Sequence, residues 1–370
     1  MPKLSFLASL LAMSLPATAE TVDLFISSAP EGIYQASFDT ETGELDNLRP
    51  VAEFAGGGFL ALHPSKPLLF STSKHEQTGS AKSFSITPEG LTELSESTTQ
   101  GRGTCQISLN HTGSLAFVAN YSSGSAASFT VDEQGQLSQE AGFAQHEGSS
   151  SHPNRQTAPH AHATVVGPDN NFLYVPDLGI DKVMIYRIDP SGALEPAGHG
   201  QLPKGSGPRH MKFSRDGNFA YVLNELSLTV TTFRRAKDSG ALDAIETISV
   251  LPDGEEPDAM TCAEIRVHPN GKYLYTSLRD LKTRISEEIG GNTLTSFAVK
   301  EDGTLERIQV VSAGVRIPRN FNLDPTGKWL IVGGQASHDI RVFSVGSDGK
   351  LTLTGRSYPC PAPICFEFRP

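Results

Sequence analysis

Cysteine is scarce in this chain, which has four cysteines among 370 residues. None of them has the CxxC spacing of a zinc or redox site, and so few thiols cannot form a disulfide scaffold in a chain of this length. A large hydrophobic core must therefore hold the fold together. Cys105, Cys262, Cys360 and Cys365 allow three pairings, and a local Cys360–Cys365 bridge and free buried thiols are both open alternatives.

Long apolar runs are missing after the first 19 residues. Those residues combine Lys3, an apolar run over residues 4–15 and the small-residue segment ATA at 17–19, which is typical of a secretory signal peptide. The run is too short for a membrane span of about 20 residues, and an uncleaved anchor is the alternative. We therefore expect a soluble mature protein, residues 20–370, that is periplasmic or secreted.

Basic residues are outnumbered, with 30 Lys and Arg against 41 Asp and Glu and a formal net charge of −11. An acidic protein repels phosphate backbones and anionic lipid, so nucleic acids and membrane surfaces are poor partners. A GxSxG nucleophile elbow is also missing, which disfavours a covalent acyl-enzyme.

Seven internal repeats fill the rest of the chain. A polar turn with a glycine followed by a leucine-type residue recurs at intervals of 45 to 63 residues. Between these turns lies a second signature, a tight turn followed by an alternating aromatic and aliphatic strand, and no long helical period competes with it. The seven turn glycines are Gly43, Gly90, Gly135, Gly192, Gly240, Gly303 and Gly349.

Four short strands per unit of about 45–55 residues are typical of a propeller blade. Seven units predict an all-β fold, one seven-bladed β-propeller domain over residues 20–370 with four-stranded blades. The first unit, residues 22–54, begins at the position of a second strand, and residues 364–368 form a lone strand. We expect this C-terminal strand to complete the first blade and close the ring, which leaves no open sheet edge.

Alignment of the blades shows where the repeats differ. The apolar strand positions agree, whereas the end of the second strand and the start of the innermost strand vary and are mostly polar. Because these strands are antiparallel, both variable sets should lie at one end of the central channel, where a concave polar cluster can form a site. The candidate residues are Tyr121, His160, His162, Asp177, Arg209, His210, Glu225, Glu264, Arg279, Arg319 and Asn320.

These residue types allow two kinds of chemistry. Histidine or glutamate can activate water, and arginine can stabilise an oxyanion. His160 and His162 would point the same way on a strand, as a metal ligand pair does, and Glu225 or Asp177 could then supply a third ligand. His63 and His268 lie in HP turns before strands and are expected to be structural.

The motifs PHAH (159–162), FLYVPDLG, GPRH (207–210), FAYVLNE, AEI, PRNF and CFEF, in this order, resemble the seven-bladed propeller lactonase family over essentially the whole mature chain. This family includes 6-phosphogluconolactonases and fungal carboxy-cis,cis-muconate cyclases. The resemblance implies a catalytic group of a PHAH histidine, Arg209, Glu225 and Arg279. It implies no obligatory metal, but unrelated propeller gluconolactonases use a divalent ion, so a metal is still an alternative.

Together with the signal peptide, the resemblance suggests a periplasmic gluconolactonase without a cofactor that hydrolyses D-glucono-1,5-lactone, because phosphorylated sugars are normally intracellular. A PHAH histidine or Glu225 would deprotonate water, and Arg209, helped by Arg279, would stabilise the oxyanion. The alternatives are a 6-phosphogluconolactonase, a lactone-forming muconate-type cyclase, and a non-catalytic exported propeller that binds a protein or glycan. The expected catalytic residues are His160, His162, Arg209, Glu225 and Arg279, and the expected substrate contacts are Tyr121, Asp177, His210, Glu264, Arg319 and Asn320.

Overall fold

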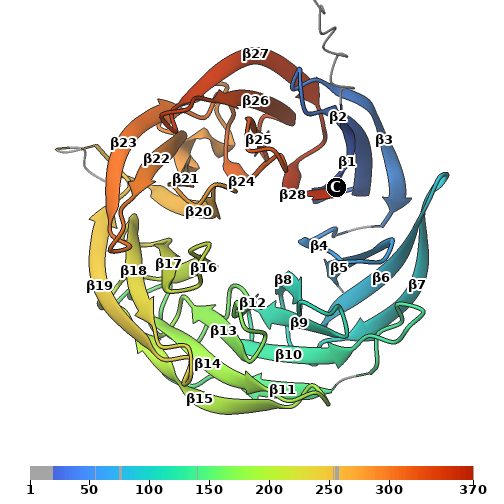
Figure 1. Ribbon diagram of the computed structural model, residues 1–370, viewed down its shortest axis with the longest axis vertical. Helices are drawn as coiled ribbons and strands as arrows, with labels where there is room; N and C mark the ends of the chain where they lie inside the picture. The colour runs from blue at the N-terminus through green and yellow to red at the C-terminus, as the bar shows by residue number, and fades with distance from the viewer. Residues whose placement is uncertain are drawn as a thin grey trace, which may run out of the picture.

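A computed structural model describes residues 20–369 except 55, 75, 76, 140, 253 and 255–257. The described residues form seven four-stranded antiparallel sheets arranged as a ring, with one 3-10 helix, η1 (Leu281–Arg284) (Figure 1). This arrangement confirms the predicted seven-bladed β-propeller and its four-stranded blades. The predicted signal peptide, residues 1–19, lies outside the described residues.

Six blades are continuous in sequence, and each runs from an innermost strand at the ring axis to an outermost strand at the rim. Three of them are β4 (Leu60–Leu62), β5 (Leu68–Lys74), β6 (Gly79–Thr87) and β7 (Gly90–Thr98); β8 (Thr104–Leu109), β9 (Leu115–Asn120), β10 (Ser125–Thr130) and β11 (Gly142–Gln145); and β12 (Val165–Val166), β13 (Phe172–Asp177), β14 (Lys182–Ile188) and β15 (Leu194–Gln201). The other three are β16 (Pro208–Phe213), β17 (Phe219–Asn224), β18 (Thr229–Arg235) and β19 (Leu242–Ser249); β20 (Met260–Val267), β21 (Tyr273–Asp280), β22 (Thr293–Val299) and β23 (Leu305–Ser312); and β24 (Pro318–Leu323), β25 (Trp329–Gly334), β26 (Asp339–Val345) and β27 (Leu351–Pro359).

The seventh blade joins the two ends of the chain. It consists of β28 (Pro363–Arg369), β1 (Thr21–Ser28), β2 (Gly32–Asp39) and β3 (Leu45–Glu53). β28 takes the innermost position and pairs antiparallel with β1, with Arg369 opposite Asp23. The predicted closure of the ring by the C-terminal strand is therefore confirmed.

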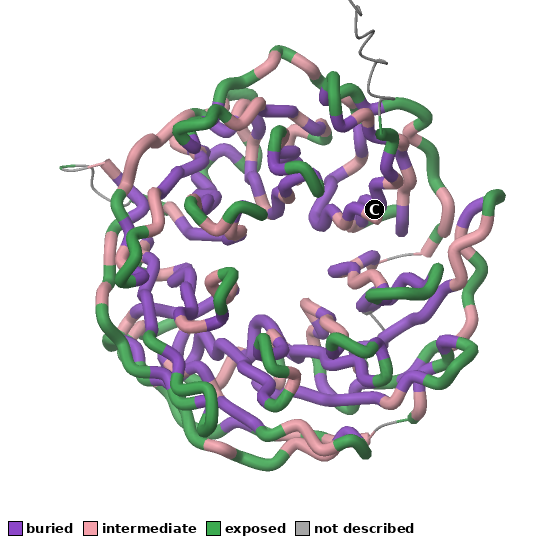
Figure 2. Tube along the Cα trace, viewed as in Figure 1, coloured by how far each residue is buried: buried purple, intermediate pink, exposed green. Residues whose placement is uncertain are grey.

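The hydrophobic core lies between neighbouring sheets. Tyr174 and Val183 of one blade, for example, pack in a single buried cluster with Met211, Val222 and Phe233 of the next. Figure 2 shows buried residues along the inner strands and exposed residues mainly on the rim and in turns. Within the described part of the chain, no helix is long and apolar enough to cross a membrane.

The two repeat signatures of the sequence meet in space. Gly349 has a φ of +77°, and a Cβ added there would lie 2.3 Å from the ring of Tyr273 in the preceding blade. The hydroxyl of Tyr275 donates to the carbonyl of Gly349 at 3.0 Å. Gly240 sits against Phe172 in the same way. The recurring glycine is thus required both by its backbone conformation and by the aromatic strand on which it packs.

Candidate active site

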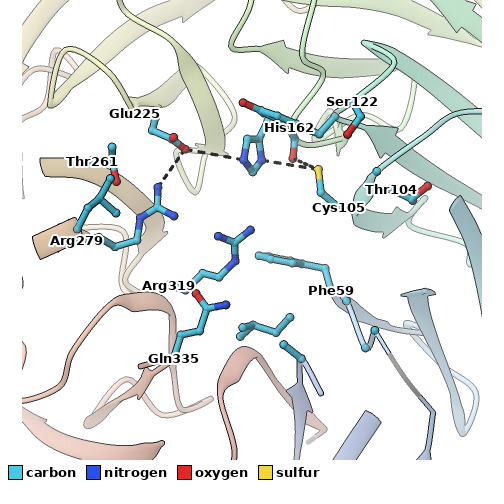
Figure 3. A pocket seen from close by; sticks show the side chains of 18 of the residues that line it. Phe59, Thr104, Cys105, Ser122, His162, Glu225, Thr261, Arg279, Arg319 and Gln335 are labelled. Carbon is cyan, nitrogen blue, oxygen red and sulfur yellow. Dashed lines mark hydrogen bonds and ion pairs between the residues drawn. The ribbon is translucent and has the colours of Figure 1, made fainter. Parts of the chain in front are cut away.

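A cavity of about 480 Å³ lies at one end of the ring axis (Figure 3). Its wall includes five of the predicted residues, and each of them comes from a different blade. These residues are Tyr121, His162, Glu225, Arg279 and Arg319. The structure therefore brings together about half of the residues that the alignment of the blades selected.

β-Bulges turn part of this wall toward the axis. The pairing of the innermost strand with the second strand shifts register around Cys105, Arg209 and Arg319. A bulge places two residues of one strand opposite one residue of its partner, which bends the strand and re-aims a side chain. These three positions belong to one column of the aligned blades, and His162 is the member of that column in the blade of β12.

Glu225, which follows β17, binds three guanidinium groups. Its Oε1 lies 2.7 Å from Nη2 of Arg155, and its Oε2 lies 3.1 Å from both Nε of Arg209 and Nη2 of Arg279. Burial alone would raise the pKa of Glu225, but the three arginines, Arg279 most strongly, lower it to about 2. At neutral pH this group is a carboxylate with both oxygens engaged, and it is a weak base.

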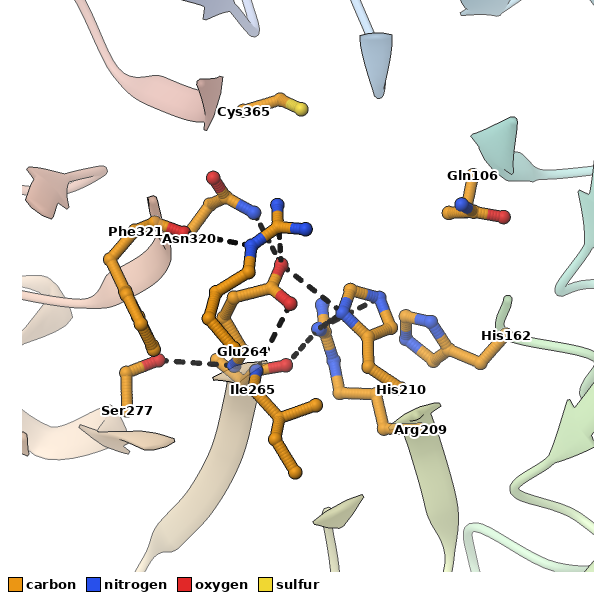
Figure 4. Close-up of polar contacts among 12 residues, drawn as sticks. Gln106, His162, Arg209, His210, Glu264, Ile265, Ser277, Asn320, Phe321 and Cys365 are labelled. Carbon is orange, nitrogen blue, oxygen red and sulfur yellow. Dashed lines mark hydrogen bonds and ion pairs between the residues drawn. The ribbon is translucent and has the colours of Figure 1, made fainter. Parts of the chain in front are cut away.

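Arg209 lies behind Glu225 and is not part of the cavity wall. Its side chain is 0% exposed, and Nη1 donates to the carbonyl of Ala263 (Figure 4). Burial and the charge of Arg279 lower the pKa of Arg209 to about 9, so the guanidinium is still charged at neutral pH. This position suits Arg209 to hold Glu225, whereas the sequence predicted a direct contact with an oxyanion.

Arg155 belongs to the cavity wall and was not among the predicted residues. It lies in the long segment between β11 and β12, and Nη2 also donates to the hydroxyl of Tyr121 at 3.1 Å. Comparison of aligned strand positions could not find it, because this segment has no counterpart in other blades. The available signal was the wide spacing between Gly135 and Gly192, which marks an insertion.

His162 is the PHAH histidine that faces the cavity. Its Nε2 lies 3.9 Å from Oε2 of Glu225, and its Nδ1 lies 3.9 Å from Sγ of Cys105 (Figure 3). Burial, together with the charges of Arg209 and other neighbours, lowers the pKa of His162 well below its usual value. The imidazole is therefore neutral at physiological pH and can accept a proton.

His160 and Asp177 support the wall from outside the cavity. Nδ1 of His160 lies 2.9 Å from the carbonyl oxygen of Tyr121, and the two rings stack with centroids 4.5 Å apart. The carboxylate of Asp177 accepts the backbone N–H of His160 at 2.7 Å and contacts Nδ1 of His146 at 2.6 Å. Both residues thus fix the PHAH segment and Tyr121, and neither faces the cavity.

His210, Glu264 and Asn320 form a second cluster further along the axis (Figure 4). Nδ1 of His210 lies 3.2 Å from Oε2 of Glu264, which also accepts from the side chain of Asn320. His210 and Glu264 line a separate cavity of about 250 Å³, and Phe59 contributes to the walls of both cavities. The expectation that all the candidate residues share one end of the channel does not match this arrangement.

Two cavity-lining arginines have no partner among the described residues. Among the described residues, none forms a hydrogen bond or ion pair with the side chain of Arg284, on η1, or of Arg319, on β24. Burial and the nearby Arg279 lower the pKa of Arg319 to about 10, so it is charged at neutral pH. Two guanidinium groups are therefore available to an incoming ligand. Arg284 lies in the insertion after β21, so aligned strand positions could not reveal it either.

The two carboxylates considered as a third metal ligand already contact other side chains. Both oxygens of Glu225 contact arginines, and Asp177 contacts His146. The described residues contain no group of three or more His, Cys, Asp or Glu side chains that could hold a metal ion. The four cysteines are free thiols; Cys262, Cys360 and Cys365 are buried, as one of the two alternatives predicted, whereas Cys105 is partly buried. Desolvation of its thiol raises the pKa of Cys105 to about 11.

Comparisons with known proteins agree with the fold. The family described as "Lactonase, 7-bladed beta-propeller" matches residues 22–368. A 6-phosphogluconolactonase of Bacillus subtilis (strain 168) is 28% identical over 351 residues, which cover 94% of this chain and 97% of the relative. The solved structure of the periplasmic gluconolactonase of Pseudomonas aeruginosa is 30% identical with a TM-score of 0.86, and the match covers 94% of this chain and 99% of that one.

Proposed function

Because the chain belongs to the seven-bladed β-propeller lactonase family and is a lactonase, we propose that it hydrolyses D-glucono-1,5-lactone to gluconate in the periplasm. One cavity contains the neutral imidazole of His162 and the charged guanidinium of Arg319, which has no partner in the described part of the chain, and this pair carries the proposal. The structural similarity to a periplasmic gluconolactonase supports the substrate and the compartment.

The proposed reaction uses His162 as the base. Nε2 takes a proton from a water molecule as the water oxygen adds to the lactone carbonyl, and Arg319 and Arg279 stabilise the negative charge that develops on the carbonyl oxygen. The bond from the carbonyl carbon to the ring oxygen then breaks, and the ring oxygen takes the proton back from the imidazolium. The sugar acid ionises on release, so each turnover liberates one proton.

Glu225 has a different role in this proposal. A carboxylate with a pKa of about 2 is too weak a base to deprotonate water at neutral pH. Its negative charge lies 3.9 Å from Nε2 of His162, where it stabilises the imidazolium that forms during the reaction. It also holds Arg279 and Arg155 in the cavity wall.

Proton release in weakly buffered solution tests the proposal. Purified protein should accelerate the hydrolysis of D-glucono-1,5-lactone above its spontaneous rate, and His162→Gln should abolish most of the increase. EDTA should leave the rate unchanged if no divalent ion takes part. A wild-type rate equal to that of buffer would exclude the proposed reaction.

A second candidate is the hydrolysis of 6-phosphogluconolactone, which the unpartnered Arg284 and Arg319 favour. Two guanidinium groups are well suited to bind a phosphate, and relatives carry the name 6-phosphogluconolactonase. The phosphorylated and unphosphorylated lactones should be compared in wild type and in Arg284→Met. A loss of kcat/KM confined to the phosphorylated substrate would favour this second candidate.

A further inference from the structure

We propose that Asp181, which lies outside the cavity, is a positioning residue that holds the backbone near Arg155 and Glu225 so that their side chains can form an ion pair. Asp181 lies in the turn between β13 and β14 and is 1% exposed. The kinetic test of this inference, given below, rests on the proposed function. The proteolysis test needs no substrate and depends only on the geometry.

The carboxylate of Asp181 joins two segments that connect neighbouring blades, one between β11 and β12 and the other between β15 and β16. Its Oδ1 accepts from Nε2 of Gln156 and from the backbone N–H of Gly207, both at 2.7 Å. Its Oδ2 accepts from the hydroxyl of Ser150 and, at 2.7 Å, from the backbone N–H of Gly205. One buried carboxylate therefore receives four hydrogen bonds, two from each segment.

The first segment carries Arg155. Gln156 follows it directly and is 0% exposed, and its Nε2 also donates to the carbonyl of Leu178 at 2.8 Å. Its Oε1 accepts the backbone N–H of His152 at 2.9 Å. Asp177 also holds this insertion, through His146 and His160, but the bonds of Asp181 and Gln156 are next to Arg155 in sequence and therefore set the position of its backbone.

The second segment sets the position of Glu225. The carbonyl of Gly207 accepts the backbone N–H of Glu225 at 2.7 Å. Both members of the ion pair between Arg155 and Glu225 are therefore connected to Asp181. Arg155 is connected through the adjacent Gln156, and Glu225 through its hydrogen bond to Gly207. A displacement of about 1 Å can cost up to a hundredfold in rate when it misplaces groups around the reacting atoms.

Asp181→Asn is the matched substitution, because asparagine has the same shape and tolerates the left-handed backbone conformation found here, with a φ of +54°. Each carboxylate oxygen accepts one hydrogen bond from each segment, so the NH₂ group that replaces one oxygen faces a donor of both segments and weakens the bridge between them. We expect kcat/KM for the hydrolysed lactone to fall roughly tenfold to a hundredfold. Arg155→Met should give a similar loss.

A double-mutant cycle separates positioning from general destabilisation. If Asp181 acts through Arg155, then Asp181→Asn should lower kcat/KM little further in a protein that already carries Arg155→Met. Additive losses, or a wild-type rate in Asp181→Asn, would overturn the inference. Ser150→Ala removes only one of the four hydrogen bonds and provides a milder variant if Asp181→Asn does not fold.

Limited proteolysis tests the geometry without any substrate. Trypsin should cut the bond between Arg155 and Gln156 many times faster in Asp181→Asn than in wild type, as mass spectrometry of the fragments can show. Asp324→Asn is the control, since Asp324 is 0% exposed and accepts the backbone N–H of Trp329 at 2.8 Å in a turn at the far end of β24. Equal cleavage at Arg155 in the two variants would overturn the inference, whereas a wild type that hydrolyses no lactone would exclude only the proposed function.

Discussion

Glu225 and His162 are both buried and lie 3.9 Å apart, yet their surroundings shift their protonation in ways that suit different roles. Three arginines keep Glu225 ionised, whereas burial and neighbouring positive charge keep His162 neutral. A site with an excess of positive charge favours any step that places negative charge on a substrate. Arg319 is one of the charges that lower the pKa of His162, and in the proposed reaction it would also stabilise the oxyanion.

Replacement of His162 should remove the proposed base. We expect His162→Gln to lower kcat about 10²- to 10⁴-fold, while His160→Gln, which alters only the support of Tyr121, should cost less. A His162→Gln variant with the wild-type rate would rule out this role.

The pH profile follows from the lowered pKa of His162. The neutral base is the active form, so kcat/KM should stay constant as the pH falls from 7.5 past 6.5 and should drop only at lower pH. The measurement is kcat/KM against pH after subtraction of spontaneous hydrolysis. A drop centred at or above pH 6.5 would contradict the assignment.

Glu225 should also make stability depend on pH. Its pKa is about 2 in the folded protein against an ordinary value of 4.5, so its contribution is present above pH 4.5 and is lost as the pH falls toward 2. Glu225→Gln should lower the free energy of unfolding by about 3–5 kcal/mol at neutral pH, because it leaves buried arginines without a counter-charge. Denaturant unfolding at pH 7 and pH 3 should show the difference between the variants shrinking at the lower pH.

At the scale of strands and loops, the sequence predicted site residues at strand positions that can be aligned between blades, and it missed those in insertions. Superposed blades revealed the column of Cys105, Arg209 and Arg319, because a position that packing does not constrain stands out among apolar neighbours. The bulges in this column break the simple alternation of a strand, so the alignment could not tell that His210 faces a second cavity. The arginines of the two insertions have no aligned partner at all.

The turn glycines allow a direct test of blade packing. Gly349→Ala should lower the free energy of unfolding by about 2–4 kcal/mol, since the new methyl group meets the Tyr273 ring and the backbone is left-handed. Gly355→Ala is the control, because Gly355 has a similar φ of +81° but nothing lies within 4 Å of an added Cβ. Equal losses would show that the contact with Tyr273 adds nothing.

The whole molecule combines an acidic chain with an arginine-rich cavity. Its formal net charge is −11, yet the cavity is lined by Arg155, Arg279, Arg284 and Arg319, and Glu225 is the acidic residue among the described ones that line it. Composition therefore described the outer surface and could not predict the charge of the site, which depends on a few residues that the ring brings together from distant parts of the chain.

Removal of β28 should open the ring. A chain that ends at residue 362 loses the innermost strand of one blade and the buried Phe366, so we expect it to lose cooperative unfolding, measured by circular dichroism with heating. A circular permutant that places residues 361–369 before β1 provides the control, because Arg369 pairs with Asp23 and a short turn can connect them. A cooperative transition in the truncated chain at the wild-type temperature would contradict this view.

Because β28 pairs with β1, the ring can close only after the chain has been synthesised through β28. β28 follows all the other strands of the ring in sequence, so a chain that stops before residue 363 leaves β1 with a row of unpaired backbone groups. Such an edge can pair with other chains and marks the product for proteases. Chains that include β28 cover that edge, and we expect chains that stop before it to expose it.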